Sequence, residues 1–412
     1  MAKRFDLCSV GSIITSVAVD QEIRRWEKYF AGRTRAGAGE GLIAILALAG
    51  AKDVISFAGG LPDPATFPGR AVADILSELV EAGDPSPFQY SPTAGLPGPR
   101  DFVAGRLERL EGRRPAEDEL LLTSGAIEAL ELVGKVFVDR GDTVAVEAPT
   151  YLGAVMAFQS FEAEVVGIPL DDDGLSVDEL ERALASGLSP KLLYTIPDHQ
   201  NPAGVSLSPG RREALVQLAR RHGFLVVEDV AYRELSFGED RPPSLWSLAP
   251  DVVLQAGTFS KTLFPGLRLG WAVGPAEIVP KLVWAKQNTD QCAGALGQRL
   301  LEEYGRRGHL DEQLKRSRDL YRFRCETLLA ALERHLAGKA TWTRPQGGFF
   351  TWLTVEADTV ELAERALAAG VAVVPGPPFF PDGSGSQHLR LSFSSAHKDE
   401  IDEGIRRLGE LL

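Results

Sequence analysis

The chain has 412 residues, of which 44% are hydrophobic and 25% are charged, and its formal net charge is −13. This composition is typical of a soluble globular protein long enough for two domains, and it excludes disordered, collagen-like and disulfide-scaffold chains. The acidic balance argues against nucleic acid or an anionic membrane as the main partner. Three widely spaced cysteines predict neither a disulfide framework nor a metal site, and they favour a cytoplasmic location.

The N-terminal segment, residues 1–50, contains no predicted strand. Lys3 and Arg4 precede the apolar-leaning run 9–19, but Asp6, several hydroxyl residues and the lack of a clean cleavage site argue against a signal peptide. The apolar run 42–49 is too short to span a bilayer. We expect this segment to pack on a smaller second domain or on a partner subunit.

From about residue 118 the chain alternates apolar runs of strand length with amphipathic helical stretches. The best-marked helix is 208–223, with Ser208 at the N-cap, Pro209 in the first turn and Gly223 after the end. Near-continuous apolar strands joined by helices indicate an α/β fold with a largely parallel sheet covered on both faces. The other predicted helix spans 126–138, and the predicted strands are 119–124, 143–149, 163–169, 191–197, 224–230 and 252–258.

After about residue 305 the pattern changes. A long charged amphipathic helix at roughly 309–336 precedes short predicted strands at 340–344, 349–353, 371–375 and 388–393, with helices between them and at the C-terminus. This pattern predicts a smaller α+β domain. We therefore divide the chain into 1–50, a large domain at 51–305 and a small domain at 306–412.

Polar groups stand at five consecutive predicted strand ends, where ligands bind in open α/β sheets. Each group alone has an ordinary explanation as a turn, a packed aromatic ring or a surface lysine, but together they are mutually compatible as a site. In chain order these groups are the turn Ser124-Gly125-Ala126, Tyr151, Asn201, Asp229 with Tyr232, and the group Thr258, Ser260 and Lys261.

Two of these residues are placed where their charge is costly. Asp229 follows an apolar strand and needs a cationic or hydrogen-bonding partner. Lys261 lies among apolar neighbours, so its ammonium group either reaches solvent or gives way to a neutral, nucleophilic amine. Arg268 adds a planar fork suited to phosphate, and a helix begins at the turn near Gly125. The set suits a planar, phosphorylated aromatic cation, and pyridoxal 5′-phosphate (PLP) fits.

Seven motifs carry a resemblance to the class I/II aminotransferases of PLP fold type I, and within them to the 2-aminoadipate and multisubstrate aminotransferases. The resemblance runs from about residue 50 to the C-terminus in the family's order. It implies a large domain with a mostly parallel, seven-stranded type of sheet, a smaller α+β domain, and transamination by a ping-pong mechanism. The motifs are SFAGGLPDP (56–64), QYSPTAGLPGPRDF (89–102), QNPAG (200–204), VVEDVAYRELSFG (226–238), TFSKTLFPGLRLGW (258–271), QGGFFTW (346–352) and LRLSFS (389–394).

The resemblance also implies a role for each residue of the site. Lys261 is expected to form the Schiff base with PLP and to carry the proton, while Asp229 keeps the pyridine nitrogen protonated. Tyr151 is expected to stack on the ring, and Asn201 and Tyr232 to bond its phenolic oxygen. The expected phosphate ligands are Gly125, Ala126, Thr258, Ser260, Arg268 and, from the second subunit of a homodimer, Tyr90. The substrate carboxylate is expected to meet Arg390, Asn201 and the backbone at Gly59 and Gly60.

Two departures from the family pattern affect the expected site. Ala126 and Ile127 stand where relatives often have Ser-Gln, so phosphate binding is expected to depend on backbone, Thr258, Ser260 and Arg268. The stretch 40–50 lacks the arginine that members acting on long dicarboxylic amino acids carry there, and Arg33 and Arg35 lie upstream. An apolar substrate side chain is therefore favoured over a distal carboxylate.

Three alternatives remain at this point. Another PLP reaction, such as β- or γ-elimination or replacement, decarboxylation or oxidation, would use the same lysine, acid and arginine. The unusual Asp198-His199 pair, the altered phosphate turn and the N-terminal extension leave it open. A transcription regulator with an aminotransferase-like domain needs a helix-turn-helix domain, for which the first 50 residues are too few. A PLP-binding scaffold without catalysis is disfavoured while Lys261, Asp229 and Arg390 are all present.

Overall fold

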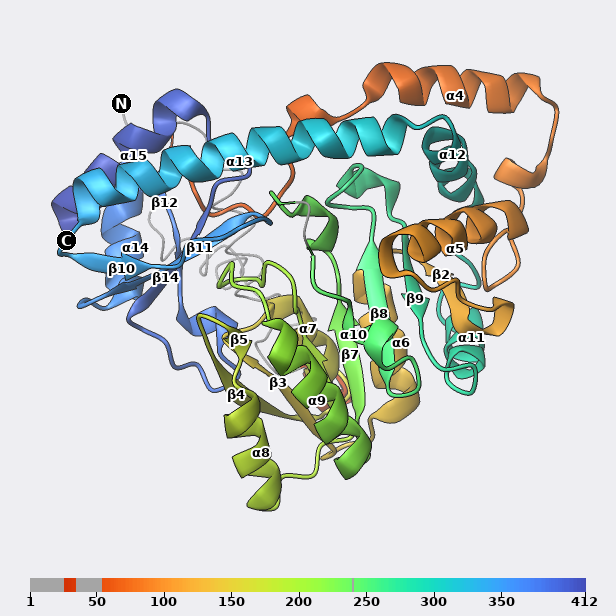
Figure 1. Cartoon of the computed structure of the whole chain (residues 1–412), viewed down its shortest axis with the longest axis horizontal. Coiled ribbons are helices and arrows are strands. Elements are labelled where there is room, and N and C mark those ends of the chain that lie inside the picture. Colours follow the sequence, from red (N-terminus) through yellow and green to blue (C-terminus); the bar gives the residue numbers. More distant parts are fainter. Residues whose placement is uncertain (1–25, 35–53, 239–240) are drawn as a thin grey trace.

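The computed structural model describes residues 26–34, 54–238 and 241–412. Its larger sheet has the strand order β2-β9-β8-β7-β6-β3-β4-β5 (Figure 1). The strands β3, β4, β6, β7 and β8 run parallel to their neighbours in this group, whereas β9 runs antiparallel to β2 and β8. The strands are β2 (Leu120–Thr123), β3 (Thr143–Ala148), β4 (Glu164–Asp171), β5 (Gly174–Leu175), β6 (Leu192–Thr195), β7 (Leu225–Asp229), β8 (Val253–Thr258) and β9 (Gly270–Val273).

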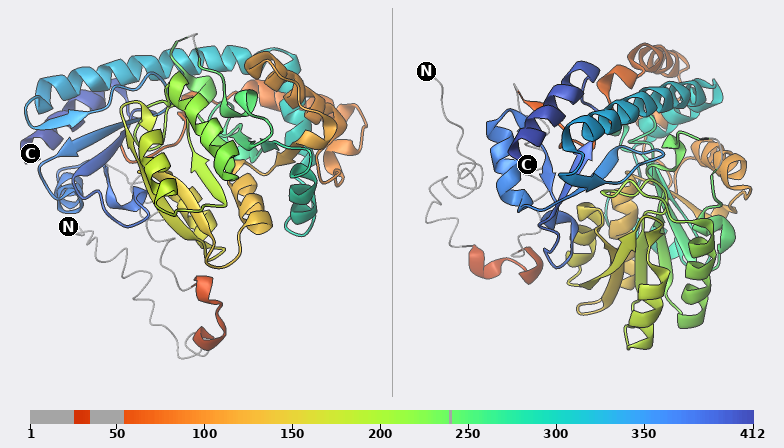
Figure 2. Two further views of the ribbon diagram at one scale, coloured as in Figure 1. Left: turned by 60° about the horizontal axis from the view of Figure 1, so that its bottom comes forward. Right: turned by 60° about the vertical axis from the view of Figure 1, so that its left-hand side comes forward.

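Helices cover both faces of this sheet (Figures 1 and 2). The strands β2, β6, β7, β8 and β9 are buried along their whole length. Their apolar runs therefore follow from the need to fill two helix-covered faces. The helices of this region are α4 (Gly69–Glu81), α5 (Pro97–Glu111), α6 (Ala126–Phe137), α7 (Leu152–Gln159), α8 (Val177–Ala185), α9 (Pro209–His222), α10 (Leu245–Leu248), α11 (Val279–Gln287) and α12 (Ala295–Arg306).

A smaller antiparallel sheet, in the order β10-β11-β14-β13, lies beside the long helix α13 (His309–Leu336). Figure 1 shows α13 running from this small sheet to α12 at the far side of the large sheet. A separate parallel pair joins β1 (Ile55–Ser56) to β12 (Val371–Ala372), so the start of the predicted large domain pairs with the C-terminal part. The remaining elements are β10 (Ala340–Trp342), β11 (Phe350–Val355), β13 (Val374–Pro375), β14 (His388–Ser392), α14 (Thr359–Ala368) and α15 (Lys398–Leu411).

Short 3-10 turns complete the described elements, and two of them are the only regular structure that the described residues show before residue 54. These turns are Glu27–Tyr29, Gly32–Thr34, Pro64–Thr66, Ser86–Phe88, Glu117–Glu119, Arg233–Leu235, Pro265–Leu267 and Pro377–Phe379. The predicted packing of the N-terminal segment falls mostly on residues outside the described ranges. Among the helices described, none has both the length and the apolar character needed to cross a membrane.

The α/β fold is confirmed, and β2, β3, β4, β6, β7 and β8 form where strands were predicted, whereas the short strand β5 was not predicted. Strand β9 lies inside the TFSKTLFPGLRLGW motif and was not predicted, because its four residues follow a turn without a separating helix. The predicted strand 371–375 divides between two sheets. Ser208 occupies the N-cap of α9, but its hydroxyl makes no capping hydrogen bond. The division at residues 305 and 306 stays a prediction.

Candidate active site

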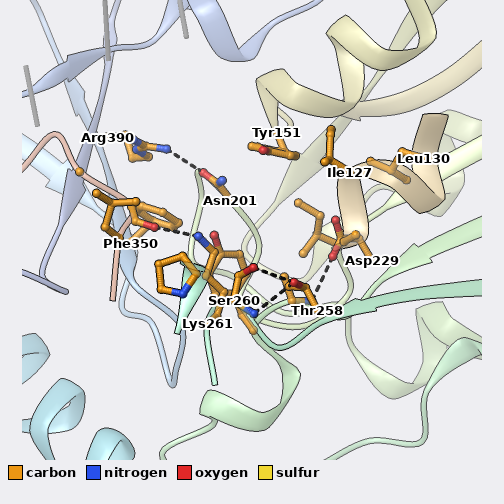
Figure 3. Close-up of a pocket in the computed structure, with 18 of the residues that line it drawn as sticks. Ile127, Leu130, Tyr151, Asn201, Asp229, Thr258, Ser260, Lys261, Phe350 and Arg390 are labelled. Atoms are coloured by element: carbon orange, nitrogen blue, oxygen red, sulfur yellow. Dashed lines mark hydrogen bonds between the residues drawn. The ribbon is translucent and has the colours of Figure 1, made fainter. Parts of the chain in front are cut away.

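A cavity of about 300 Å³ lies at the ends of the central strands, between the large sheet and the C-terminal part. Figure 3 shows side chains from both parts pointing into it. Its walls bring together residues that are distant in the sequence, which the parallel sheet achieves by placing successive strand ends at one edge. The predicted site residues that line it are Gly60, Ala126, Tyr151, Asn201, Asp229, Tyr232, Thr258, Ser260, Lys261, Arg268 and Arg390.

Lys261 follows β8 and directs its amine into this cavity. Its Nζ atom donates a hydrogen bond to the carbonyl of Gly60 at 3.0 Å, and none of the salt bridges found among the described residues includes it. Burial and the nearby guanidinium of Arg390 lower the pKa of Lys261 to about 8. About a tenth of this amine is therefore neutral at pH 7, far more than for an ordinary lysine, and the neutral form is the nucleophile.

Asp229 ends β7 and is fully surrounded by protein. Its carboxylate accepts hydrogen bonds from the hydroxyl of Tyr194 at 2.9 Å and from the amide of Ala231 at 3.0 Å. Burial raises the pKa of Asp229, and Lys261 is the cation that acts on it. No basic side chain of the described residues forms a salt bridge with it. A buried carboxylate of this kind is stabilised by a ligand that brings a protonated nitrogen.

Asn201 and Arg390 join the two parts of the molecule across the cavity, as the dashed line in Figure 3 shows. The Nη1 atom of Arg390 donates to Oδ1 of Asn201 at 3.0 Å, and its Nη2 donates to the carbonyl of Ala58 at 2.7 Å. Burial raises the pKa of Tyr232, while a hydrogen bond with Asn201 opposes that rise. Arg390 remains charged at neutral pH, although burial lowers its pKa to about 10.

A turn between β2 and α6 forms one end of the cavity. Gly125 has a φ of 98°, and a Cβ atom there would lie 2.8 Å from Nη2 of Arg268. Arg268 itself has a φ of 51°, donates to the carbonyl of Ser124 at 3.0 Å, and donates to Oγ of Ser260 at 3.3 Å. The hydroxyl of Thr258 donates to that of Ser260 at 3.0 Å. Helix α6 begins here, so its first N–H groups have no intrahelical partner and suit an anion.

Three residues singled out in the sequence lie away from this cavity. Tyr90 is 78% exposed, and it does not line the cavity of its own chain. The carboxylate of Asp198 is bonded by Arg212 and Arg233 at 2.7 and 3.0 Å. His199 is buried against Gly347 and Gly348, and burial lowers its pKa to about 4. The pair Asp198-His199 thus contributes to packing rather than to the cavity wall.

Arg33, one of the two arginines upstream of the stretch 40–50, is exposed and does not line the cavity. Arg35 and the stretch 40–50 lie outside the described residues. Phe350 and Tyr194 were not predicted as site residues. Phe350 lines the cavity with its ring centroid 4.4 Å from the guanidinium carbon of Arg390. Its position in the motif QGGFFTW was a usable signal, whereas Tyr194 looks like an ordinary apolar strand residue.

Comparisons with known proteins agree with this geometry. The family model "Aminotransferase class I and II" matches residues 53–408. The chain belongs to the class I and II aminotransferases. It is 38% identical to aromatic-amino-acid aminotransferase 1 of Thermococcus litoralis, with 94% of each chain covered. It is 40% identical to 2-aminoadipate transaminase of Thermus thermophilus, covering 94% of this chain and 97% of that one.

Solved structures confirm the fold of this aminotransferase. The α-aminoadipate aminotransferase of Thermus thermophilus, complexed with N-(5′-phosphopyridoxyl)-L-leucine, matches with a TM-score of 0.86 and 40% identity. The alignment covers 94% of this chain and 98% of that structure. The fold is that of PLP fold type I, and the protein is a PLP-dependent transaminase. The alternative PLP reactions are not favoured.

The cavity of this aminotransferase fits pyridoxal phosphate on three observations of its own. The Asp229 carboxylate is buried without an ion-pair partner among the described residues. The turn at Gly125 would be filled by any Cβ atom, so it leaves backbone N–H groups open to a phosphate. The Lys261 amine has a lowered pKa. These are the three groups that would hold the pyridine nitrogen, the phosphate and the aldehyde carbon.

Proposed function

We propose that this aminotransferase moves the amino group of an L-amino acid to a 2-oxo acid in two half-reactions, with Lys261 as the Schiff-base lysine and proton carrier. The observation that carries this assignment is the convergence of three groups on one cavity. These are the neutral-leaning amine of Lys261, the buried carboxylate of Asp229 and the guanidinium of Arg390. A protein that only binds PLP would not need a nucleophilic amine beside the residues that hold the electron-accepting ring.

When bound, PLP supplies an aldehyde that condenses with amines and an aromatic ring that accepts electrons from the substrate's α-carbon. Lys261 acts through Nζ, which accepts the proton from that carbon once the substrate has displaced it. Asp229 holds a proton on the ring nitrogen by its negative charge. Asn201 and Tyr232 would hold the phenolic oxygen, and the ring of Tyr151, which lines the cavity, would stack on the cofactor ring.

The proposed substrate is an α-amino acid with an apolar or aromatic side chain. Arg390 binds its carboxylate, beside Asn201 and the backbone at Gly60. Among the described residues, the basic side chains that line the cavity are Lys261, Arg268 and Arg390, and all three are assigned to the cofactor or to the α-carboxylate rather than to a distal carboxylate. Leu61, Ile127 and Phe350 supply apolar surface instead. The relative named aromatic-amino-acid aminotransferase 1 supports this assignment.

The proposed active unit is a cytoplasmic homodimer in which Tyr90 reaches the phosphate site of the second subunit. Tyr90 and Phe88 are 78% and 60% exposed, and their segment lies against α12, where Leu296 is also exposed. Large exposed apolar side chains on neighbouring elements are typical of a protein interface. The free thiols of Cys292 and Cys325 agree with a reducing compartment.

A half-reaction screen tests the proposed function. The purified PLP form is mixed with single L-amino acids, and the absorption is followed as it changes to that of pyridoxamine phosphate. We expect conversion with leucine or phenylalanine and faster conversion than with 2-aminoadipate. Lys261→Ala serves as the control, and it should lose both the covalent lysine–PLP absorption and turnover. Release of ammonia without a 2-oxo acid acceptor, or no conversion with any amino acid, would contradict transamination.

A further inference from the structure

A buried ion cluster lies behind the turn at Gly125. Lys286 of α11 has a fully buried side chain, and its Nζ atom lies 2.7 Å from both carboxylate oxygens of Glu128. The same Nζ lies 2.8 Å from both oxygens of Asp290. Burying one cation with two carboxylates is costly, and it is retained where the groups fix a particular geometry. None of the three residues lines the cavity.

Both carboxylates also bind Ser124, the residue before Gly125. The amide of Ser124 donates to Oε2 of Glu128 at 2.5 Å, and its hydroxyl donates to Oδ2 of Asp290 at 2.9 Å. On the opposite side, Nη2 of Arg268 donates to the Ser124 carbonyl at 3.0 Å. The amide, the hydroxyl and the carbonyl of one residue are therefore each fixed by a charged side chain. Charge-assisted bonds of this kind are stronger than neutral ones.

The cluster does more than attach α6 to α11. Lys135, farther along α6, already ties these two helices, because its Nζ donates to Thr289 at 3.0 Å and to the carbonyl of Ala285 at 3.3 Å. Lys135 makes no bond to Ser124 in the described structure. Glu128 and Asp290 also fix the orientation of the turn. The peptide groups of this turn lead directly into the first N–H groups of α6.

We propose that Lys286, Glu128 and Asp290 form a positioning unit that orients the phosphate-binding turn through Ser124. This inference rests on the proposed function, in which the backbone at Gly125 and Ala126 meets the phosphate. Ala126 and Ile127 offer no side-chain donors, so phosphate affinity depends on how well the backbone N–H groups are oriented. A turn released from its carboxylates loses that orientation, although every lining residue is still present.

The test compares the affinities of the apoenzyme for PLP and for pyridoxal, which has the same ring and aldehyde but no phosphate. In Glu128→Ala and Asp290→Ala we expect the affinity for PLP to fall about tenfold or more, because the amide or the hydroxyl of Ser124 loses its charged partner and the turn loses its fixed orientation. The affinity for pyridoxal should stay within about twofold, and inorganic phosphate should compete less well. Glu128→Gln keeps an acceptor for the Ser124 amide and should lose less.

Lys135→Met is the matched control, since it removes a bond between the same two helices without touching Ser124. It should leave the preference for PLP over pyridoxal unchanged. Asp290 is partly exposed, so Asp290→Ala keeps the test available if Glu128→Ala does not fold. Equal losses of affinity for PLP and for pyridoxal, or a loss of PLP affinity in Lys135→Met as large as in Glu128→Ala, would contradict the role of the positioning unit. Neither result would contradict the proposed function. A wild-type enzyme without any preference for PLP would overturn the phosphate site itself, and the unit with it.

Discussion

Arg390 and Asn201 are hydrogen-bonded across 3.0 Å, which links strand β14 of the small sheet to the loop that follows β6 of the large one. The guanidinium is also held by the carbonyl of Ala58 and lies over the rings of Phe350 and Phe379, at 4.4 and 4.8 Å from their centroids. Its orientation is therefore set by four separate parts of the chain. A carboxylate that reaches it meets a preorganised fork.

Arg390→Lys should lower kcat/KM for every amino acid substrate by about a hundredfold, because an ammonium group cannot bind two carboxylate oxygens in one plane. PLP affinity should change little, since Arg390 is not assigned to the cofactor. Steady-state kinetics and PLP titration of the same preparation measure the two effects. Phe379→Leu is a suitable control, because it alters the surroundings of the guanidinium and keeps the fork. An unchanged kcat/KM in Arg390→Lys would place the carboxylate elsewhere.

The pH dependence of PLP capture reports the state of Lys261. The pKa of its amine is lowered from 10.5 to about 8 by burial and by Arg390, so the neutral form grows as the pH rises and is nearly complete above that value. The rate at which the apoenzyme captures PLP, divided by the rate for the free ε-amine of Nα-acetyl-lysine, should be constant and highest below pH 8, where the neutral forms of both amines grow in the same proportion. Above pH 8 the ratio should fall, since only the model amine continues to deprotonate.

Taking this ratio cancels the titration of PLP itself, which is common to both reactions. A ratio that stays constant from pH 7 to about pH 10 would mean that Lys261 has the ordinary lysine pKa.

Asp229→Asn should lower the rate of the half-reaction by about 10²- to 10³-fold, because the amide has no charge to hold a proton on the ring nitrogen. PLP should remain bound, since Lys261 and the phosphate turn are unchanged. Tyr194→Phe is the matched control. It removes the 2.9 Å hydrogen bond to Asp229 and keeps the charge, so its loss should stay below about tenfold. Equal losses in the two variants would show that the orientation of Asp229 matters more than its charge.

Sequence patterns sufficed to predict the strands β2, β3, β6, β7 and β8 that carry the site, because their apolar runs are bounded by polar residues at the strand ends. The same reasoning failed where long-range contacts decide. Tyr194 has the appearance of a core aromatic, and only the neighbouring strand reveals that its hydroxyl meets Asp229. Lys286 and Glu128 are 158 residues apart, so no local pattern connects them.

The pair Asp198-His199, one reason for leaving another PLP reaction open, is explained by a long-range contact of the same kind. Arginines from α9 and from the turn Arg233–Leu235 form salt bridges with Asp198. Family resemblance supplied the roles of Arg390 and Tyr90, which residue patterns alone did not indicate. For Arg390, the hydrogen bond to Asn201 now gives that assignment a geometric basis, while the role of Tyr90 stays a prediction.

Hybrid dimers test whether Tyr90 acts on the second subunit. One chain carries Lys261→Ala and the other carries Tyr90→Ala, so each parent homodimer is impaired at both of its sites. If Tyr90 acts across the interface, one site of the hybrid combines both changes and the other contains an unaltered Lys261 and an unaltered Tyr90. When the two chains are mixed and the hybrid dimer is separated from both parents, it should have about half of the wild-type activity per dimer.

If Tyr90 instead serves its own chain, each hybrid site keeps one defect and no activity returns. Tagging the two chains differently allows the hybrid to be purified, and its mass in solution checks that a dimer has formed. This experiment assumes that the wild-type enzyme is a dimer, and sedimentation of the wild-type enzyme tests that assumption separately. A wild-type enzyme that is fully active as a monomer would exclude the cross-subunit role. Tyr90 would then have no role at the phosphate, since it is 78% exposed and does not line the cavity of its own chain.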